Sequence, residues 1–296
     1  MENILIIGSA HTVIGSRARS MAEEKENIAF EETGQSAGGS GYKASLFVAK
    51  MGFPYLAAFA FGNGVYADFM RKAAEENNIH VLGESEETAG CSYDLSDDTG
   101  GSGRFIVSGG EYAFSPSYLK TVNPEEIAAV IVFSDMLADR DAMEIYNVIE
   151  QIDAPIFLVI SERGGEIDQR ILLSMFALSP TVICEEEYAS SLIEADCKSL
   201  DETAAEIVRY TFSRVMICTK KNGVYYHDGE VQFRCEAHDE YDADLFAAAF
   251  VLAKTAGLDE RNSCYFALET AETYTGEDDL FFAERRKTLA KRISAK

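Results

Sequence analysis

Short apolar runs recur along the chain and alternate with segments whose apolar residues have a helical spacing. The apolar runs are residues 4–7, 56–61, 128–133, 156–160, 181–183 and 215–218. The helical segments between them are residues 42–51, 67–77, 139–151, 167–177 and 204–212. Continuous apolar runs of this length are typical of strands buried on both faces. Their alternation with helices indicates an α/β fold with a mainly parallel sheet of about eight strands, covered by helices on both sides.

The last third of the chain adds a hairpin and three helices to this pattern. Residues 224–226 and 231–233 flank the turn Asp228-Gly229, which predicts a β-hairpin. Residues 244–256 are largely apolar on every side and predict a buried helix. Residues 264–273 and 284–293 predict two further helices.

Two polar stretches do not follow the strand–helix alternation. Residues 15–35 are polar and charged, and residues 91–108 alternate polar and apolar side chains around the glycine-rich turn 100–103. Such alternation is typical of a hairpin with one face in water. We therefore predict a small β-lid, inserted into a larger domain. The predicted division of the chain is a main α/β domain of residues 1–14, 38–88 and 114–296, with a lid of residues 15–37 and 89–113.

The chain has 296 residues and a net charge of −24, spread along its whole length. This field repels phosphate backbones and anionic lipid, so we expect neither a nucleic acid nor a membrane as a partner. The six cysteines include no Cys-x-x-Cys pair, and we expect them to be reduced and mostly buried. The N-terminal residues carry no signal or membrane-spanning pattern, so we expect a cytoplasmic protein.

Several kinds of active site have no signature in this sequence. There is no Gly-x-x-x-x-Gly-Lys-Ser/Thr loop, which excludes a Walker-type nucleotide site. The histidines other than His238 are scattered along the chain, which gives a hydrolase site little support. Residues 238–244 gather one histidine, one glutamate and three aspartates at the start of the buried helix. Acids in this position cap a helix and interact favourably with its dipole. A metal-dependent hydrolase that uses these acids is a further hypothesis.

The order of these features resembles that of the ribokinase-like (PfkB-type) carbohydrate kinases over nearly the whole chain. The family has a first strand that ends in Gly-Ser, a diglycine motif that opens a helix, an Asn-x-x-Glu motif, and an aspartate that starts a buried helix. The matching residues are Gly8, Gly38, Gly39, Gly41, Gly52, Glu187, Gly223, Asp244 and Phe246. The resemblance implies a ribokinase-like three-layer sandwich with an inserted β-lid.

The resemblance also implies an activity, namely transfer of the γ-phosphoryl group of ATP, with Mg²⁺, to a hydroxymethyl group of a sugar or nucleoside. Asp244 matches the catalytic base, and Glu187 matches the acid of the magnesium-linked motif. The implied substrate contacts are Gly38, Gly39, Lys43 and His11, and the implied nucleotide contacts are Thr219, Asn222, Gly223 and Ala243. Family lids often pair with each other, so we expect a homodimer through the lid.

This chain departs from the family pattern at several of these positions. Val13 stands where the family has an aspartate that binds the sugar, and His11 and Lys43 stand where it has asparagines. Cys184 replaces the asparagine of Asn-x-x-Glu, and Lys220 replaces a glycine. Before the base, Gly-Ala-Gly has become Tyr241-Asp242-Ala243, which adds two side chains and a negative charge. Two hypotheses follow: a kinase with an altered phosphate site, or a catalytically inactive member that binds a ligand or forms an oligomeric scaffold.

Overall fold

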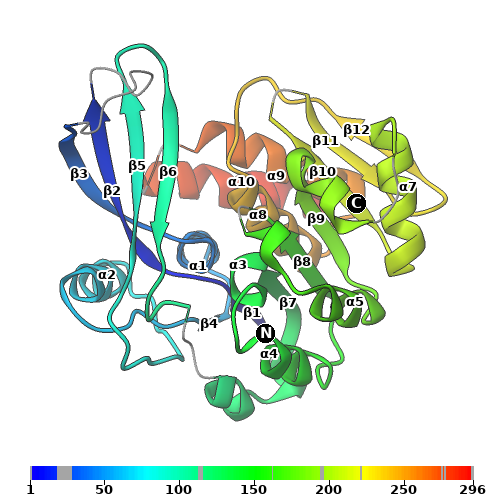
Figure 1. Ribbon diagram of the computed structural model, residues 1–296. Helices are drawn as coiled ribbons and strands as arrows, with labels where there is room; N and C mark the ends of the chain where they lie inside the picture. The colour runs from blue at the N-terminus through cyan, green and yellow to red at the C-terminus, as the bar shows by residue number, and fades with distance from the viewer. Residues whose placement is uncertain are drawn as a thin grey trace.

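The chain folds into two β-sheets that stand apart from each other, a large one surrounded by helices and a small one at its side (Figure 1). The computed structural model describes residues 2–18, 29–112, 116–161, 163–193, 197–220, 222–274, 276 and 278–294.

The large sheet has eight strands in the order β12-β11-β10-β9-β8-β7-β1-β4. Their bounds are β1 Asn3–Ile7, β4 Tyr55–Ala58, β7 Ile127–Phe133, β8 Ile156–Ile160, β9 Thr181–Glu185, β10 Val215–Thr219, β11 Gly223–His227 and β12 Gln232–Cys235. The six strands from β10 to β4 are all paired in parallel, and β10-β11-β12 form an antiparallel edge. The prediction of a mainly parallel sheet is confirmed.

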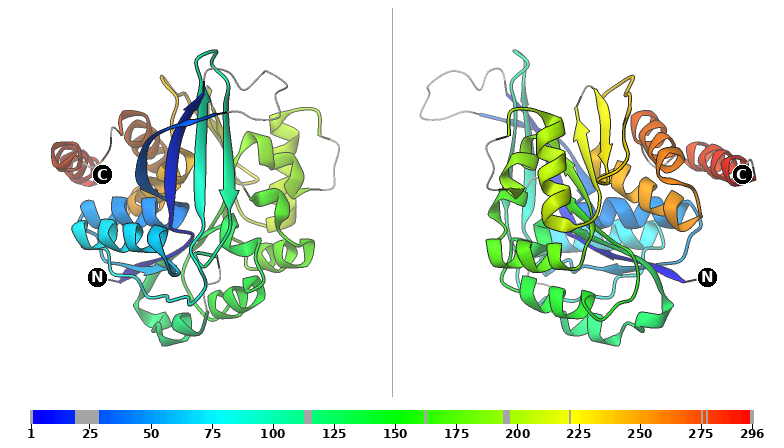
Figure 2. Two further views of the ribbon diagram at one scale, coloured as in Figure 1. Left: turned by 60° about the vertical axis from the view of Figure 1, so that its left-hand side comes forward. Right: turned by 90° about the vertical axis from the view of Figure 1, so that its right-hand side faces the viewer.

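Helices cover both faces of the large sheet, so the domain has three layers (Figure 2). Ile4 and Ile6 of β1 face one layer, while Leu5 and Ile7 face the other, as the two-residue period of a strand requires. The first layer contains α1 Ser40–Lys50, α8 Ala243–Thr255, α9 Glu260–Thr273 and α10 Asp279–Ser294. The second contains α3 Ser134–Leu137, α4 Ala142–Ile149, α5 Gln169–Ala177 and α7 Leu200–Thr211.

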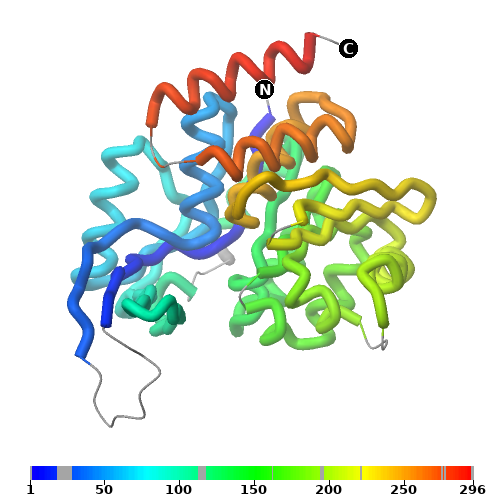
Figure 3. Tube along the Cα trace, turned by 90° about the horizontal axis from the view of Figure 1, so that it is seen from above, coloured from blue at the N-terminus to red at the C-terminus, as the bar shows by residue number. Residues whose placement is uncertain are grey.

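Helix α8 is the centre of the first layer. Its residues from Leu245 to Ala253 are all buried, which agrees with the prediction of a helix that is apolar on every side. It packs against both α1 and α9, and α10 lies outside α9 (Figure 3). Because α8 is fixed on all sides, its N-terminus is a rigid position from which to hold a functional side chain.

The small sheet has the order β3-β2-β5-β6. Its strands are β2 His11–Ala18, β3 Glu31–Gly38, β5 Cys91–Asp97 and β6 Ser102–Val107. Strands β5 and β6 pair antiparallel, as predicted, and β2 joins the two hairpins by parallel pairing with β5. The division into main domain and lid remains a prediction: β2 begins at His11, inside the predicted main domain, and residues 19–28 and 113–115 lie outside the described residues.

Several element bounds differ from the predictions for local reasons. Helix α1 begins at Ser40, two residues early, because Gly39 with φ 95° forms its N-cap. Strand β4 ends at Ala58, three residues before the end of the predicted run, and Phe59 is buried in the same cluster as Ala57 of that strand. Helix α10 begins at Asp279, because Phe281 and Phe282 pack into the core. The remaining elements are α2 Val65–Glu76, α6 Glu186–Ala189 and short 3₁₀ turns at Pro116–Thr121, Pro124–Glu126, Gly164–Glu166 and Ser190–Leu192.

The cysteines were predicted to be reduced and mostly buried. All six are described, none is in a disulfide, and five are buried, whereas Cys197 is half-buried. No helix among the described residues is both long and apolar enough to cross a membrane.

Candidate functional site

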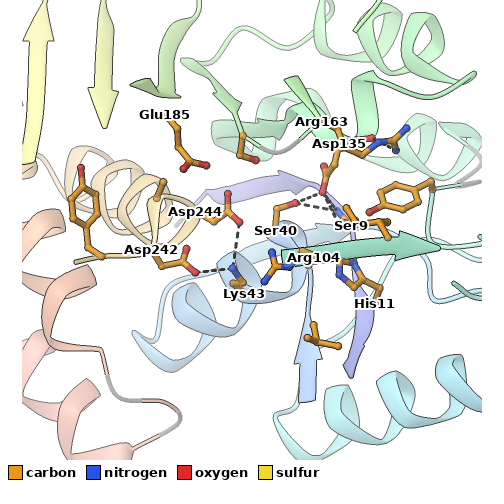
Figure 4. A pocket seen from close by; sticks show the side chains of 17 residues that line it. Ser9, His11, Ser40, Lys43, Arg104, Asp135, Arg163, Glu185, Asp242 and Asp244 are labelled. Carbon is orange, nitrogen blue, oxygen red and sulfur yellow. Dashed lines mark hydrogen bonds and ion pairs between the residues drawn. The ribbon is translucent and has the colours of Figure 1, made fainter. Parts of the chain in front are cut away.

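A cavity of about 220 Å³ lies where the large and small sheets approach each other (Figure 4). It opens at the carboxyl ends of the parallel strands, where α/β sheets usually bind their ligands. The lining residues are Ser9, His11, Val13, Gly39, Ser40, Lys43, Arg104, Ile106, Tyr112, Asp135, Ser161, Arg163, Glu185, Tyr241, Asp242, Ala243 and Asp244. They therefore come from the loop after β1, the small sheet, the start of α1, the ends of other parallel strands and the segments that follow them, and the start of α8.

The N-terminus of α8 carries two carboxylates into this cavity. Asp242 is the N-cap, and its Oδ1 accepts a hydrogen bond from the backbone N–H of Leu245 at 3.0 Å. Asp244 lies in the first turn, and its side chain is 17% exposed. The Oδ1 atom of Asp244 is buried and accepts no hydrogen bond from the described residues. A buried carboxylate oxygen without a partner is a ready acceptor for a proton or a hydroxyl group.

Lys43 faces both of these carboxylates from α1. Its Nζ lies 2.7 Å from Oδ2 of Asp242 and 3.5 Å from Oδ2 of Asp244, and the dashed lines in Figure 4 join it to both. Burial works against the charge on Lys43, but the two carboxylates outweigh burial and raise its pKa. Lys43 is therefore a fixed cation at the start of α8.

The two carboxylates respond to the same surroundings in opposite ways. Burial raises the pKa of Asp244 to about 7, with Lys43 opposing this shift and the negative charges of Asp242, Asp135 and Glu185 adding to it. Asp242 also loses water, but its short contact with Lys43 outweighs that loss and lowers its pKa. At neutral pH, Asp242 is therefore ionised, while Asp244 is close to half protonated, which suits a general base.

Asp135 lies across the cavity and is held by two hydroxyl groups. Ser9 Oγ donates to its Oδ2 at 2.5 Å, and Ser40 Oγ donates to the same oxygen at 2.7 Å. Gly39, which precedes Ser40, has to be glycine, because a Cβ atom there would lie 2.5 Å from the carbonyl oxygen of Ser9. The diglycine turn thus brings α1 against the end of β1 and positions Ser40.

The second oxygen of Asp135 is buried and accepts no hydrogen bond from the described residues. Burial raises the pKa of Asp135, and the hydrogen bonds from Ser40 and Ser9 oppose that shift. Arg163 lies beside it, donates to the backbone oxygen of Asp135 at 3.3 Å, and stacks over the ring of Tyr112. Asp244 and Asp135 thus present two buried acceptor oxygens to one cavity.

The small sheet covers the cavity with residues from β2 and β6. His11 and Val13 reach it from β2, and Arg104 and Ile106 reach it from β6. Arg104 forms two hydrogen bonds with Asp94 on the neighbouring strand. Burial, followed by the charges of Arg104 and Lys43, lowers the pKa of His11 to about 4, so its ring is neutral at pH 7.

Of the four predicted nucleotide contacts, Thr219, Asn222 and Gly223 lie at the turn between β10 and β11, whereas Ala243 lines the cavity. Thr219 and Asn222 line a separate side pocket of about 150 Å³. Gly223 has φ 81°, and a Cβ atom there would lie 1.9 Å from the carbonyl oxygen of Cys235, so only glycine fits. Thr219 Oγ1 donates to the Gly223 carbonyl oxygen at 2.8 Å, and the Tyr241 hydroxyl donates to the same oxygen at 2.9 Å.

The predicted metal residue, Glu187, lies apart from both pockets. It is on α6, where it forms an ion pair with Lys220 at 3.3 Å, and both side chains are at least half exposed. Among the described residues, no three or more His, Cys, Asp or Glu side chains are grouped so as to hold a metal ion.

The structure brings some of the predicted site residues together and adds others. His11, Gly39, Lys43, Ala243 and Asp244 line the cavity. Gly38 pairs with His11 in the small sheet without lining it. The sequence reasoning missed Ser9, Ser40, Arg104, Asp135, Arg163 and Glu185. Ser9, Asp135 and Glu185 carried a usable signal, since each lies two residues after a predicted parallel strand, at the sheet edge where ligands bind.

Comparison with known proteins shows the fold. The chain matches no protein-family model and no curated protein sequence. Its structure is similar to the ribokinase of Thermotoga maritima (TM-score 0.77, 15% identity, covering 98% of this chain and 100% of that one). It is also similar to Arabidopsis thaliana ribokinase complexed with ribose and ATP (TM-score 0.77, 17% identity, covering 97% of this chain and 99% of that one). A third similar structure is Escherichia coli phosphofructokinase-2 in complex with fructose-6-phosphate (TM-score 0.74, 14% identity, covering 98% of this chain and 100% of that one). The resemblance to ribokinase-like kinases is confirmed at the level of the fold.

Proposed function

We propose that this protein is an ATP-dependent carbohydrate kinase that transfers a phosphoryl group to a hydroxymethyl group of a sugar or nucleoside. The observation that carries this proposal is the buried, unpartnered Oδ1 of Asp244 at the start of α8, in a chain that matches ribokinases over nearly its whole length. A hydroxyl group bound at this oxygen would lose its proton to Asp244 as it attacks the phosphorus atom.

The other cavity residues are proposed to hold the carbohydrate. Asp135 would accept a hydrogen bond from a second substrate hydroxyl through its free Oδ1, with Ser9 and Ser40 fixing its orientation. The backbone of Gly38 and Gly39 and the side chains of His11 and Lys43 complete the proposed substrate contacts. The small sheet would then act as a lid that keeps water away from the reacting groups.

The nucleotide is proposed to lie on the side of Thr219, Asn222, Gly223 and Ala243. Glu187 on α6 is the candidate contact for a Mg²⁺ ion that arrives with the nucleotide. ATP with Mg²⁺ supplies the phosphoryl group, and the chain supplies the base and the orientation of the acceptor.

A second candidate function is ligand binding without phosphoryl transfer. The hydrogen bond from Tyr241 to Gly223 favours it, because the tyrosine side chain reaches from the cavity to the proposed nucleotide side and links the two loops. Asp242 adds a negative charge at the same helix end, where phosphate would bind. Such a protein would bind its carbohydrate in the cavity and serve as a sensor or as an oligomeric scaffold.

The two functions are separated by nucleotide binding and by turnover. A kinase is stabilised by Mg²⁺-ATP and phosphorylates at least one member of a panel of sugars and nucleosides. Asp244→Asn should abolish that activity without unfolding the protein, because an amide cannot take the hydroxyl proton. Asp259→Asn, at the N-cap of α9 outside the cavity, is the matched control and should remain active. No thermal shift and no product from any acceptor would support the binding function instead.

We further propose a homodimer through the small sheet and a cytoplasmic location. The location is supported by the six cysteines without a disulfide, and a fluorescent fusion that concentrates outside the cytoplasm would contradict it.

A further inference from the structure

Lys43 stands apart from the other two basic residues of the cavity in what it contacts. Arg104 is bound by Asp94 within the small sheet, and Arg163 is bound by Glu166 at 2.9 Å beside α5. The ammonium of Lys43 instead contacts Asp242 and Asp244, which both belong to the start of α8. It is thus the cation that α1 places at the N-terminus of the buried helix.

The position of the base fixes where a reacting phosphoryl group would lie. A hydroxyl that gives its proton to Asp244 lies within about 3 Å of that carboxylate, and the phosphorus that it attacks lies about 3–3.5 Å further on. The helix N-terminus favours the anionic group on its own side. Lys43 Nζ is 3.5 Å from the same carboxylate and 2.7 Å from the N-cap side chain. The oxygens of the phosphoryl group therefore fall within reach of this ammonium.

We propose that Lys43 contacts the phosphoryl group during its transfer, as the cation that stabilises the negative charge on its oxygens. This inference rests on the proposed kinase function. In the reaction, the substrate oxygen forms a bond to the γ-phosphorus and passes its proton to Asp244. The bond from that phosphorus to the bridging oxygen breaks, and its electron pair leaves on ADP. Lys43 supplies charge and neither gains nor loses a proton.

The charges at the helix start explain why this chain needs a lysine here. Tyr241 and Ala243 carry side chains, and the carboxylate of Asp242 would repel phosphate. Lys43 neutralises Asp242 when no phosphate is present, and a phosphate that arrives takes the place of Asp242 as its partner. Burial lowers the pKa of Lys43, but the neighbouring carboxylates raise it by more. The ammonium therefore stays charged.

Kinetics of three variants test the contact. Lys43→Met should lower kcat by ~100-fold or more, in the range found for removal of one transition-state donor, and the loss of its proposed carbohydrate contact should raise the carbohydrate KM by a much smaller factor. Lys43→Arg keeps the charge and should recover part of kcat. Lys50→Met is the matched control, since Lys50 ends the same helix and pairs with Asp279 away from the cavity. A Lys43→Met variant with unchanged kcat and a raised carbohydrate KM would overturn the proposal.

A binding measurement keeps the inference distinct from the kinase function. Inorganic pyrophosphate should raise the melting temperature of the unaltered protein and of Lys50→Met, but not of Lys43→Met. The double variant Lys43→Met with Asp242→Asn should also show no shift, which excludes an effect of the unpaired Asp242. If no acceptor is phosphorylated but the shift still depends on Lys43, the kinase function fails and the phosphate contact stands. If pyrophosphate stabilises all variants equally, or none of them, the contact is wrong.

Discussion

The hydroxyl of Tyr241 donates a hydrogen bond to the carbonyl oxygen of Gly223 at 2.9 Å, and this bond ties the start of α8 to the turn between β10 and β11. Thr219 donates to the same oxygen, so both hydrogen-bonding positions of that carbonyl are used within the protein. Tyr241 also lines the cavity. One side chain therefore reaches from the proposed acceptor site to the proposed nucleotide side.

Removing the side chains of the loop that precedes α8 should improve nucleotide binding. The triple variant Tyr241→Gly, Asp242→Ala and Ala243→Gly removes the ring and one negative charge and exposes backbone N–H groups at the start of α8. We expect ATP to bind roughly tenfold more tightly, or about 1.4 kcal/mol, by calorimetry with Mg²⁺. Tyr241→Phe is the control, because it removes only the hydrogen bond and should cost about 1 kcal/mol of stability. Equal affinity in all three proteins would show that the loop does not limit binding.

Replacing Asp244 by asparagine should stabilise the protein in a way that depends on pH. Its pKa is raised from 3.8 to about 7 in the folded state, so folding favours the protonated form. The stability that the proton provides is complete below pH 3.8 and is lost as the pH rises through 7. The gain from Asp244→Asn should therefore grow between pH 4 and pH 7 and reach on the order of 1–3 kcal/mol at pH 8. Urea unfolding across this range measures it.

If the free energies of unfolding of Asp244→Asn and of the unaltered protein differ by the same amount at every pH from 4 to 8, Asp244 has an ordinary pKa in the folded protein. The same series with Asp259→Asn reports what an amide does at a helix N-cap outside the cavity.

The elements that the sequence predicted best are those whose pattern is local. Residues 4–7 and 156–160 are continuous apolar runs, and both became buried parallel strands because runs this short fit a strand that is covered on both faces. Helix α8 was recognised because its residues are apolar on every side. Asp244 was found because it starts that helix and matches a motif. In each case the signal lies within a few neighbouring residues.

The residues that the sequence did not reveal are joined only by the fold. Arg104 reaches the cavity because β6 pairs with β5, which pairs in parallel with β2, and the sequence does not specify that order of strands. Asp135 is fixed by Ser9 and Ser40, which lie 126 and 95 residues away along the chain. The pairing of Lys43 with Asp242 spans 199 residues. Without a tertiary structure, such contacts have no signature.

His11 should remain neutral in the folded protein down to acidic pH. Burial, together with Arg104 and Lys43, lowers its pKa from 6.5 to about 4. A lowered pKa means that its contribution to stability is complete above pH 6.5 and is lost as the pH falls through 4. Relative to His11→Asn, the unaltered protein should lose about 1–3 kcal/mol of stability between pH 7 and pH 4. Proton NMR of the ring should show no titration between pH 8 and pH 5.5, and a midpoint near 6.5 would contradict the buried environment.

The outer face of the small sheet carries exposed apolar side chains. Arg104 and Ile106 of β6 point into the cavity, so the alternating residues Phe105 and Val107 face away from it, and they are 63% and 53% exposed. Strand β6 is also an edge strand, which leaves one row of backbone groups without a partner in the sheet. An apolar face and an open edge on one small sheet favour a second copy of the chain as their cover.

Phe105→Glu should therefore convert a homodimer into a monomer. The buried carboxylate would lose its water and face the same charge on the related subunit, which costs more than the apolar contact contributes. Light scattering at micromolar concentration should give twice the mass of the chain for the unaltered protein and for Leu280→Glu, a control on α10 with a 66% exposed side chain. Phe105→Glu should give the mass of one chain with unchanged circular dichroism. A monomeric unaltered protein at this concentration would show that the small sheet is not a dimer interface, and a dimeric Phe105→Glu variant would place the interface on another surface.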